Sequence, residues 1–223
     1  MPGLIALVGG DEFRSHAVDM DRAIVDATGV ERPAVVIIPT AAAGQRPELA
    51  AEHGVKHFSS LGADASSVMV MKSSHADDAD LLSPIASADV IYFTGGNPAH
   101  LLDVLTDSLL LKMSIEVVER GKILAGSSAG AMVLGTWMRF REWREALGVV
   151  PDIVTLPHHE RANPDEVVKE LAQSAPPGVT AFGIDGATAC IGTPGNWKAL
   201  GHGNVTVYKN GEWRRYSSGE AIA

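Results

Sequence analysis

The feature that most constrains this chain is a series of short apolar runs, rich in valine and isoleucine, separated by segments with a helical pattern. Continuous runs of this kind are typical of strands buried on both faces of a parallel sheet. The alternation predicts an open, three-layer α/β fold, in which a mostly parallel sheet is covered by helices on both faces. The runs lie at residues 4–10, 34–40, 67–71, 89–96 and 122–128.

Helices are expected between these runs, and shorter strands are expected near the C-terminus. Asn210-Gly211 is a two-residue hairpin signal between two of the late strands. No repeat or low-complexity linker divides the chain, so we expect residues 1–223 to form a single domain. The expected helices span about 14–28, 47–61, 77–86, 98–120, 129–138 and a segment that begins at Asn163-Pro164.

The charge and the cysteine content exclude several classes of function. A net charge of -9 and the lack of a Lys/Arg run argue against nucleic acid or a membrane as a partner. The single cysteine, Cys190, excludes an internal disulfide and a multi-cysteine metal site. With no basic leader and no apolar stretch long enough to span a bilayer, we expect a cytoplasmic protein.

The strongest local signal is the pattern G-x-S-x-G at Gly126–Gly130, placed between an expected strand and an expected helix. A nucleophile elbow requires this context, because a tight turn lifts the serine above the sheet. The following helix also directs its free N–H groups toward an oxyanion that forms beside the serine. Ser128 is therefore the candidate nucleophile.

A serine nucleophile needs a base, which is normally a histidine positioned by a third group. His158 follows the apolar run IVTLP, and so is expected at the sheet edge where the elbow opens. Six other histidines lie among polar residues or in a turn, where we expect solvated surface. For the third group the segment between serine and histidine offers Glu142, Glu145 and Asp152.

Two further glycine turns follow expected strands. Gly95-Gly96-Asn97 could direct backbone N–H groups toward an anion at the same sheet edge. The string GGDEF at residues 9–13 spells the signature of diguanylate cyclases, but it lies at the end of the first expected strand, without the preceding part of such a domain. We interpret that string as a coincidence.

Taken together, these segments resemble the serine peptidases of the peptidase E and cyanophycinase family, which have a fold like class I glutamine amidotransferases (flavodoxin-like). The resemblance covers most of the chain from Leu4 to Gly211. It is carried by VIYFTGGNPAHLL, AGSSAGAMVLG, TLPHH, FGIDGATACI and LGHGNVTVYKNG.

The resemblance implies a catalytic domain with Ser128 as nucleophile and His158, rather than its neighbour, as base. It also implies an oxyanion hole from the N–H groups of Ala129, Gly95 and Gly96. We favour Glu142 over Glu145 as the acid, because Glu145 adjoins the apolar strand that follows it. The remaining candidates are expected to bind substrate and comprise Asn97, Ser127, His159 and Arg161.

The chain departs from the family where the substrate is recognised. The family carries extra arginines shortly after the histidine and a GIDE motif, whereas this chain has Arg161 alone there and Gly186 in place of the motif's glutamate. Cleavage of a small peptide is expected, without strict aspartyl specificity. The mechanism needs no metal and no cofactor, and a homodimer is left open.

Other functions remain as alternatives. An esterase of the α/β-hydrolase type also has this elbow, but it places further strands between serine and histidine. A glutamine amidotransferase requires cysteine at the elbow. A non-peptidase serine acyl hydrolase, such as an esterase or amidase, or an inactive binding protein on the same fold would also fit, since fold alone does not decide function.

Overall fold

The computed structural model describes residues 3–222, and its framework is built from strands grouped in three sheets. The strands are β1 (Leu4–Val8), β2 (Ala34–Ile38), β3 (Asp64–Ser67), β4 (Val90–Phe93), β5 (Ile123–Ser127), β6 (Trp137–Phe140), β7 (Glu142–Glu145), β8 (Ile153–Pro157), β9 (Thr180–Ile184), β10 (Thr188–Thr193), β11 (Asn196–Gly201), β12 (Asn204–Lys209), β13 (Glu212–Ser217) and β14 (Ala221–Ile222).

Helices connect and cover these strands. The α-helices are α1 (Val18–Asp26), α2 (Pro47–Ser60), α3 (Ser73–Ala76), α4 (Pro98–Leu105), α5 (Leu109–Glu119), α6 (Ala129–Leu134) and α7 (Pro164–Ser174). Short 3₁₀ turns are η1 (Ser15–Ala17), η2 (Thr40–Ala42), η3 (Ser83–Ser87) and η4 (His159–Arg161). Within residues 3–222, none of these helices has the length and apolar run that crossing a bilayer takes.

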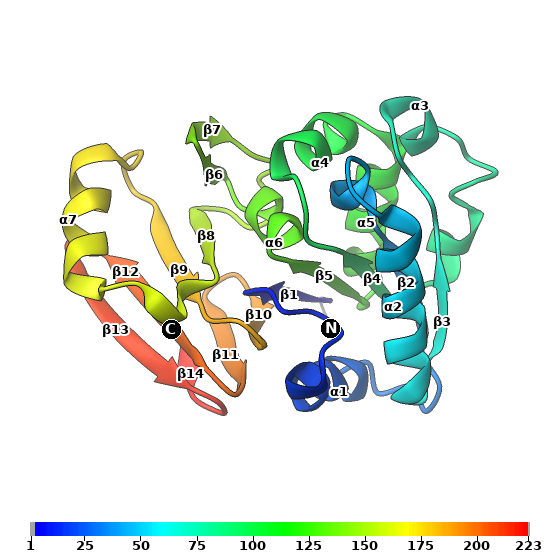
Figure 1. The fold of residues 1–223 in the computed structure, drawn as a ribbon, viewed down its shortest axis with the longest axis horizontal. Helices are drawn as coiled ribbons and strands as arrows, with labels where there is room; N and C mark the ends of the chain where they lie inside the picture. The colour runs from blue at the N-terminus through cyan, green and yellow to red at the C-terminus, as the bar shows by residue number, and fades with distance from the viewer. Residues whose placement is uncertain (1–2, 223) are drawn as a thin grey trace.

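The largest sheet has the strand order β14-β11-β10-β1-β5-β4-β2-β3 (Figure 1). Its half from β1 to β3 is parallel, and the late strands β10, β11 and β14 extend it with antiparallel pairs beyond β1. In this parallel half, the carboxyl ends of β1, β4 and β5 lie at one edge, which is where sites form in such sheets. The mostly parallel α/β fold expected from the sequence is confirmed.

Alternate residues of each central strand face two different hydrophobic clusters, as the period of two requires. In β1, Ile5 and Leu7 join the cluster formed with α4, α5 and α6, whereas Ala6 and Val8 join the cluster formed with α1 and α2. Helices therefore cover both faces. Burial of these apolar side chains, at about 25 cal/mol per Å² of apolar area, is the main force that holds the layers together.

A second sheet, with the order β13-β12-β9-β8, lies beside the first and carries α7 on its outer side (Figure 1). Residues of this sheet, including Phe182, Val205 and Tyr216, belong to the same hydrophobic cluster as Leu7 of the large sheet. The hairpin turn at Asn210-Gly211 forms between β12 and β13 as expected, with both residues at positive φ.

Four expected elements differ from the sequence interpretation. Where a helix was expected at 77–86, the structure has turns and the 3₁₀ segment η3, and the short helix α3 ends before that range. The third strand forms at residues 64–67 rather than 67–71, because Val68 and Val70 bury their side chains in the core without joining a strand. The helix expected at 98–120 is split, since Asp107 has a φ of 58° and the Ser108 hydroxyl caps a new helix at the Leu111 N–H. The helix expected at 129–138 ends before Gly135, and the charged stretch after it forms the β6–β7 hairpin.

A buried polar pair joins α1 to α2. Asp21 Oδ2 lies 2.9 Å from His57 Nε2, and both side chains are buried, although the sequence placed His57 at the solvated surface. Burial raises the pKa of Asp21, and its hydrogen bond with His57 opposes that rise. The rings of Phe13, Phe58 and Tyr92 pack around this pair and against one another.

The closest approach between α6 and the sheet gives a test of the fold. A methyl group on Gly130 would lie 2.4 Å from the carbonyl oxygen of Phe93, and backbone cannot move aside cheaply. We expect Gly130→Ala to cost about 1–3 kcal/mol or more and to lower Tm by about 5 °C or more. Gly44→Ala is the matched control, because a methyl group there meets open space. Equal Tm values for both variants in thermal denaturation would contradict this packing.

Candidate active site

Ser128 lies at a strained turn between β5 and α6. Its φ of 48° and ψ of −106° fall outside the regions that L-residues ordinarily adopt, and such strain clusters at functional sites. The Ser128 N–H donates to the carbonyl of Val8 at 2.9 Å. The turn is possible because Gly126 and Gly130 contact each other where side chains would collide. This is the geometry of a nucleophile elbow.

His158 reaches the serine from the end of β8, in the second sheet. Its N–H donates to the carbonyl of Gly9 at 2.9 Å, and its backbone is left-handed, with a φ of 52°. The imidazole packs directly over Gly10, where a methyl group would lie 2.1 Å from Cε1. His158 Nε2 lies 3.2 Å from Ser128 Oγ, within hydrogen-bonding distance. The structure thus brings the two expected catalytic residues together.

Three backbone N–H groups were expected to form the oxyanion hole, and they differ in their partners. The N–H of Gly95 donates to Glu12 Oε1 at 2.8 Å, so in this structure that donor is occupied. Within residues 3–222, the N–H groups of Gly96 and Ala129 donate to no backbone or side-chain acceptor. Ala129 is the first residue of α6, where the helix dipole adds to the attraction for an anion.

Glu12 is a site residue that the sequence interpretation missed. Its Oε2 accepts a hydrogen bond from the buried Ser127 hydroxyl at 2.8 Å, and its Oε1 accepts the one from Gly95. It lines the same pocket as Ser128 and His158. Glu12 belongs to the string that we interpreted as a coincidence; its position just after the first buried strand was the signal that could have identified it.

Asp11, the neighbour of Glu12, fills the space beside Gly186. A methyl group on Gly186 would lie 2.6 Å from Asp11 Oδ2, so the position where the family has glutamate is covered here by another acid. The Gly186 N–H donates to Glu160 Oε2 at 3.0 Å. The pKa of Glu160 is lowered, first by a hydrogen bond from its own backbone N–H and then by the Gly186 N–H, with His158 contributing less.

The acids expected to orient His158 lie on the exposed hairpin. Among residues 3–222, neither Glu142 nor Glu145 forms a hydrogen bond or ion pair with His158. In Figure 1 the hairpin stands above β8. Asp152 lies at the opposite end of β8 from His158 and is exposed.

None of the four residues expected to bind substrate lines the pocket that contains Ser128, and three of them have other hydrogen-bond partners. The Asn97 side chain accepts from the N–H groups of Ala99 and His100, which makes it the N-cap of α4. Ser127 is buried beneath Glu12. Arg161 is exposed on η4. Capping holds Asn97 and burial holds Ser127 away from the pocket.

His159 also points away from the pocket. Its Nε2 lies 2.6 Å from the Tyr208 hydroxyl, and the pair is buried between η4 and β12. Burial lowers the pKa of His159 and raises that of Tyr208 to about 12. Both side chains are therefore neutral at pH 7, and their hydrogen bond anchors the segment that carries His158.

The pocket at Ser128 contains charged groups of both signs beside an apolar lining. Its volume of about 450 Å³ is within the range of about 300–1,000 Å³ that is usual for small-molecule sites. It lies against the start of α2, and it includes two exposed arginines, Arg14 and Arg46, that form no ion pair within residues 3–222. Neither arginine was singled out from the sequence.

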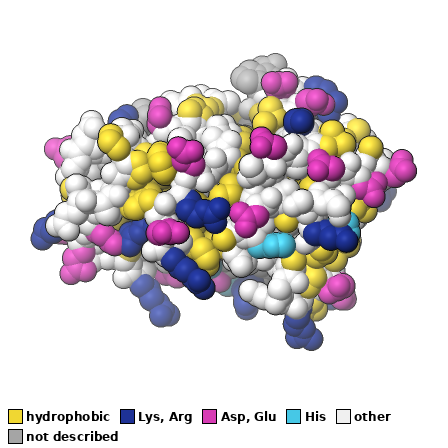
Figure 2. Space-filling model, turned by 90° about the horizontal axis from the view of Figure 1, so that it is seen from above, with side chains coloured by type: hydrophobic (Ala, Val, Ile, Leu, Met, Phe, Trp, Pro, Cys, Tyr) yellow, Lys and Arg dark blue, Asp and Glu magenta, His cyan; other side chains and the backbone are white. Residues whose placement is uncertain are grey.

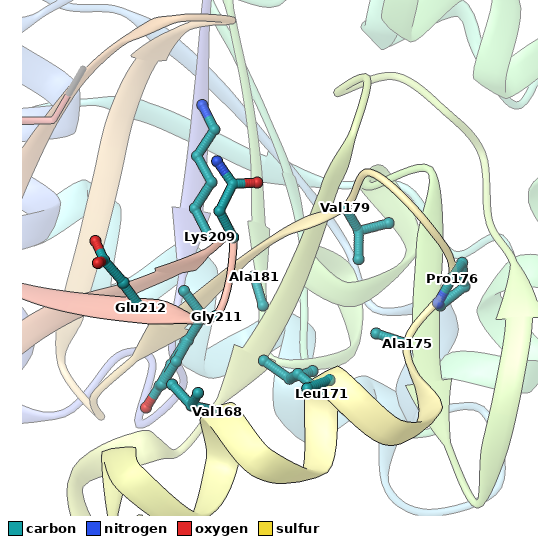
Figure 3. Close-up of a pocket in the computed structure, with 12 residues that line it drawn as sticks. Val168, Leu171, Ala175, Pro176, Val179, Ala181, Lys209, Gly211 and Glu212 are labelled. Carbon is teal, nitrogen blue, oxygen red and sulfur yellow. The ribbon is translucent and has the colours of Figure 1, made fainter.

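Another hollow and the charged surface differ from this pocket. A second hollow, between α7 and the β12–β13 turn, has apolar walls that include Val168, Leu171 and Val179 (Figure 3) and contains neither Ser128 nor His158. Figure 2 shows acidic and basic side chains interspersed over one face, without a field of a single sign. Cys190 is fully buried, and burial raises the pKa of its thiol, so it is no rival nucleophile.

Comparisons with known proteins agree with this geometry. A cyanophycinase from Trichormus variabilis is 24% identical over 219 residues, which cover 91% of this chain and 72% of the relative. The crystal structure of a peptidase from an acI-B1 Actinobacterium matches with a TM-score of 0.87 and 28% identity, over 100% of this chain and 97% of that one.

A more distant structure shares the fold. A putative peptidase E from Listeria monocytogenes matches with a TM-score of 0.63 and 18% identity, over 97% of this chain and 99% of that one. The model of peptidase family S51 matches residues 4–191, which is most of the chain. The chain therefore belongs to peptidase family S51, and is a serine hydrolase with the glutamine amidotransferase-like fold of that family.

Proposed function

We propose that this chain is a serine peptidase that hydrolyses small peptides, in the manner of a dipeptidase or aminopeptidase. The observation that carries the proposal is the 3.2 Å approach of His158 Nε2 to Ser128 Oγ at a strained elbow that opens into a pocket. Membership of a peptidase family makes a peptide bond the expected target.

The residues support an acyl-enzyme mechanism. His158 Nε2 takes the hydroxyl proton while Ser128 Oγ bonds to the carbonyl carbon, and the carbonyl oxygen gains the negative charge. The free N–H groups of Gly96 and Ala129 are the donors for that oxyanion. His158 then gives its proton to the leaving amine as the C–N bond breaks. Water, deprotonated by the same histidine, releases the acid from Ser128.

The two arginines of the pocket support a small peptide with a free carboxylate. A guanidinium binds a carboxylate through two parallel hydrogen bonds, so Arg14 or Arg46 suits the C-terminus of a dipeptide or an acidic side chain. They would take the role of the family's arginines after the histidine, which this chain lacks.

Glu142 is the proposed third member of the triad. Facing residues of a strand pair share one side of the sheet, so Glu142 lies on the side of Phe140 and Met138, which packs on the core. Glu145 faces Trp137 and so lies on the side that packs toward α7. Catalytic hydrogen bonds often tighten only in the substrate complex, which would bring the hairpin to His158.

The nucleophile is tested by Ser128→Ala. We expect loss of at least about 1,000-fold in kcat for dipeptides, since the residual rate would come from binding and oxyanion stabilisation alone. Mass spectrometry should detect an acyl adduct in the wild type and none in the variant. The exposed Ser59→Ala is the control. Turnover by Ser128→Ala at the wild-type rate would exclude this mechanism. If the wild type hydrolyses esters but no peptides, the esterase alternative is favoured. If the wild type hydrolyses neither, a binding protein is favoured.

The acid is tested by comparing Glu142→Gln with Glu145→Gln. Loss of the carboxylate that orients the base should lower kcat by about 100-fold or more, because a wrong tautomer costs about 10⁴ in a well-studied triad. We expect this loss for Glu142 and less than about 3-fold for Glu145. Equal, small losses would mean that neither glutamate orients His158.

The arginines are tested with a dipeptide and its C-terminal amide. In the double variant Arg14→Gln/Arg46→Gln, we expect the preference for the free carboxylate to fall by about 10-fold or more, mainly through KM, because charge-assisted hydrogen bonds are lost. Arg22→Gln, an exposed arginine on α1, is the control. An unchanged preference in the double variant would place the carboxylate elsewhere.

A further inference from the structure

Glu12 is held beside the nucleophile from three strand ends. It follows β1, its Oε1 accepts the N–H of Gly95 after β4, and its Oε2 accepts the hydroxyl of Ser127 at the end of β5, both at 2.8 Å. A methyl group placed on Gly95 would lie 2.8 Å from Glu12 Oε1 and 3.3 Å from Ser128 Cβ. The carboxylate therefore borders the position of the reacting carbonyl.

The backbone around Glu12 is strained, and its position is fixed by packing. Asp11 and Phe13 have φ values of 57° and 64°, in the left-handed region that non-glycine residues rarely adopt. The Phe13 ring anchors the turn by packing against Phe58 and Tyr92. Strain of this kind persists only where the surrounding structure enforces one conformation.

Glu12 carries a negative charge without a cationic partner in this part of the chain. Both of its hydrogen bonds come from donors, and among residues 3–222 it forms no ion pair with a lysine, arginine or histidine. A carboxylate has about four acceptor positions, so two remain for a ligand. A half-buried, unpaired carboxylate is costly, and a cation from the substrate would offset that cost.

We propose that Glu12 binds the free α-ammonium group of the substrate, and that this contact restricts the enzyme to N-terminal residues. The inference rests on the proposed function of the Ser128 site. In a peptide, the amino nitrogen of the N-terminal residue is two bonds from the carbonyl carbon that the serine attacks. A carboxylate beside that position therefore meets the ammonium when the first peptide bond is the one cleaved.

A preceding residue would remove this contact. It would convert the ammonium to a neutral amide and would place further chain against Glu12. The pocket thus has a negative end beside Ser128 and positive groups, Arg14 and Arg46, on the segments that lead into η1 and α2. That pattern is complementary to a zwitterionic dipeptide.

The experiment compares aminoacyl p-nitroanilides that have a free or an N-acetylated amino group. We expect the wild type to favour the free amine by about 100-fold or more in kcat/KM. Glu12→Gln keeps the shape but removes the charge, and should reduce this ratio to below about 10, mainly by raising KM. Glu31→Gln, an exposed glutamate between α1 and β2, is the matched control.

The pH profile separates binding from a structural role. An α-amino group has a pKa of about 8, so kcat/KM of the wild type for the free amine should fall above that pH. The charged groups that share the pocket are Asp11, Arg14, Arg46, His53 and His158. These groups act on the free and the acetylated substrate alike. A decrease in kcat/KM that comes from the substrate's amino group must therefore be missing with the acetylated substrate, and it must be weakened in Glu12→Gln.

Two outcomes would overturn the inference. The first is equal cleavage of the free and the acetylated substrate by the wild type. The second is an equal loss of kcat/KM in Glu12→Gln for both substrates and for p-nitrophenyl acetate. That result would mean that Glu12 only positions the turns at Gly95 and Ser127. If the wild type itself shows no turnover that depends on Ser128, the proposed function is contradicted instead.

A binding measurement tests the inference without catalysis. Calorimetric titration of Ser128→Ala with alanyl-leucine and with N-acetyl-alanyl-leucine should give at least about 10-fold tighter binding of the free amine. Adding Glu12→Gln to that variant should abolish the difference. Equal affinity of the two peptides for Ser128→Ala would refute an ammonium site.

Discussion

Two carbonyl groups at the end of β1 hold the active site together. The carbonyl of Val8 accepts the N–H of Ser128, and that of Gly9 accepts the N–H of His158. One central strand thus fixes the backbones of the proposed nucleophile and base, which come from different sheets. Gly10, directly after them, leaves the space in which the imidazole lies. The Oγ–Nε2 hydrogen bond depends on this arrangement, and so does every step of the proposed chemistry.

The sequence predicted the features that follow from local pattern. Buried strands, their flanking helices and the elbow at Ser128 have spacing and composition that chain neighbours determine, and His158 followed from its place at a strand end. The split of the helix at Asp107 was missed because apolar periodicity continues across the break. The β6–β7 hairpin was missed because its charged residues looked like a solvated face, while Met138 is buried.

The walls of the pocket could not be predicted from local pattern. Glu12, Arg14 and Arg46 meet Ser128 only through the fold, and no spacing in the sequence links them. The partners of the residues chosen as binding groups also come from the fold, since Asn97 caps a helix and His159 bonds to Tyr208. Loops of this kind carry the groups that face a substrate, while the strands and helices supply a rigid scaffold.

The proposed catalytic pair spans the boundary between the two main sheets, with Ser128 after β5 of one and His158 after β8 of the other. Few backbone hydrogen bonds cross that boundary, and side-chain packing carries most of the contact. A shift of about 1 Å between the sheets would strain both the hydrogen bond from the His158 N–H to the Gly9 carbonyl and the approach of His158 Nε2 to Ser128 Oγ, while every strand stayed intact. Enzymatic turnover is therefore a finer gauge of the sheet-to-sheet interface than circular dichroism, and inactivation on heating should precede the loss of secondary structure.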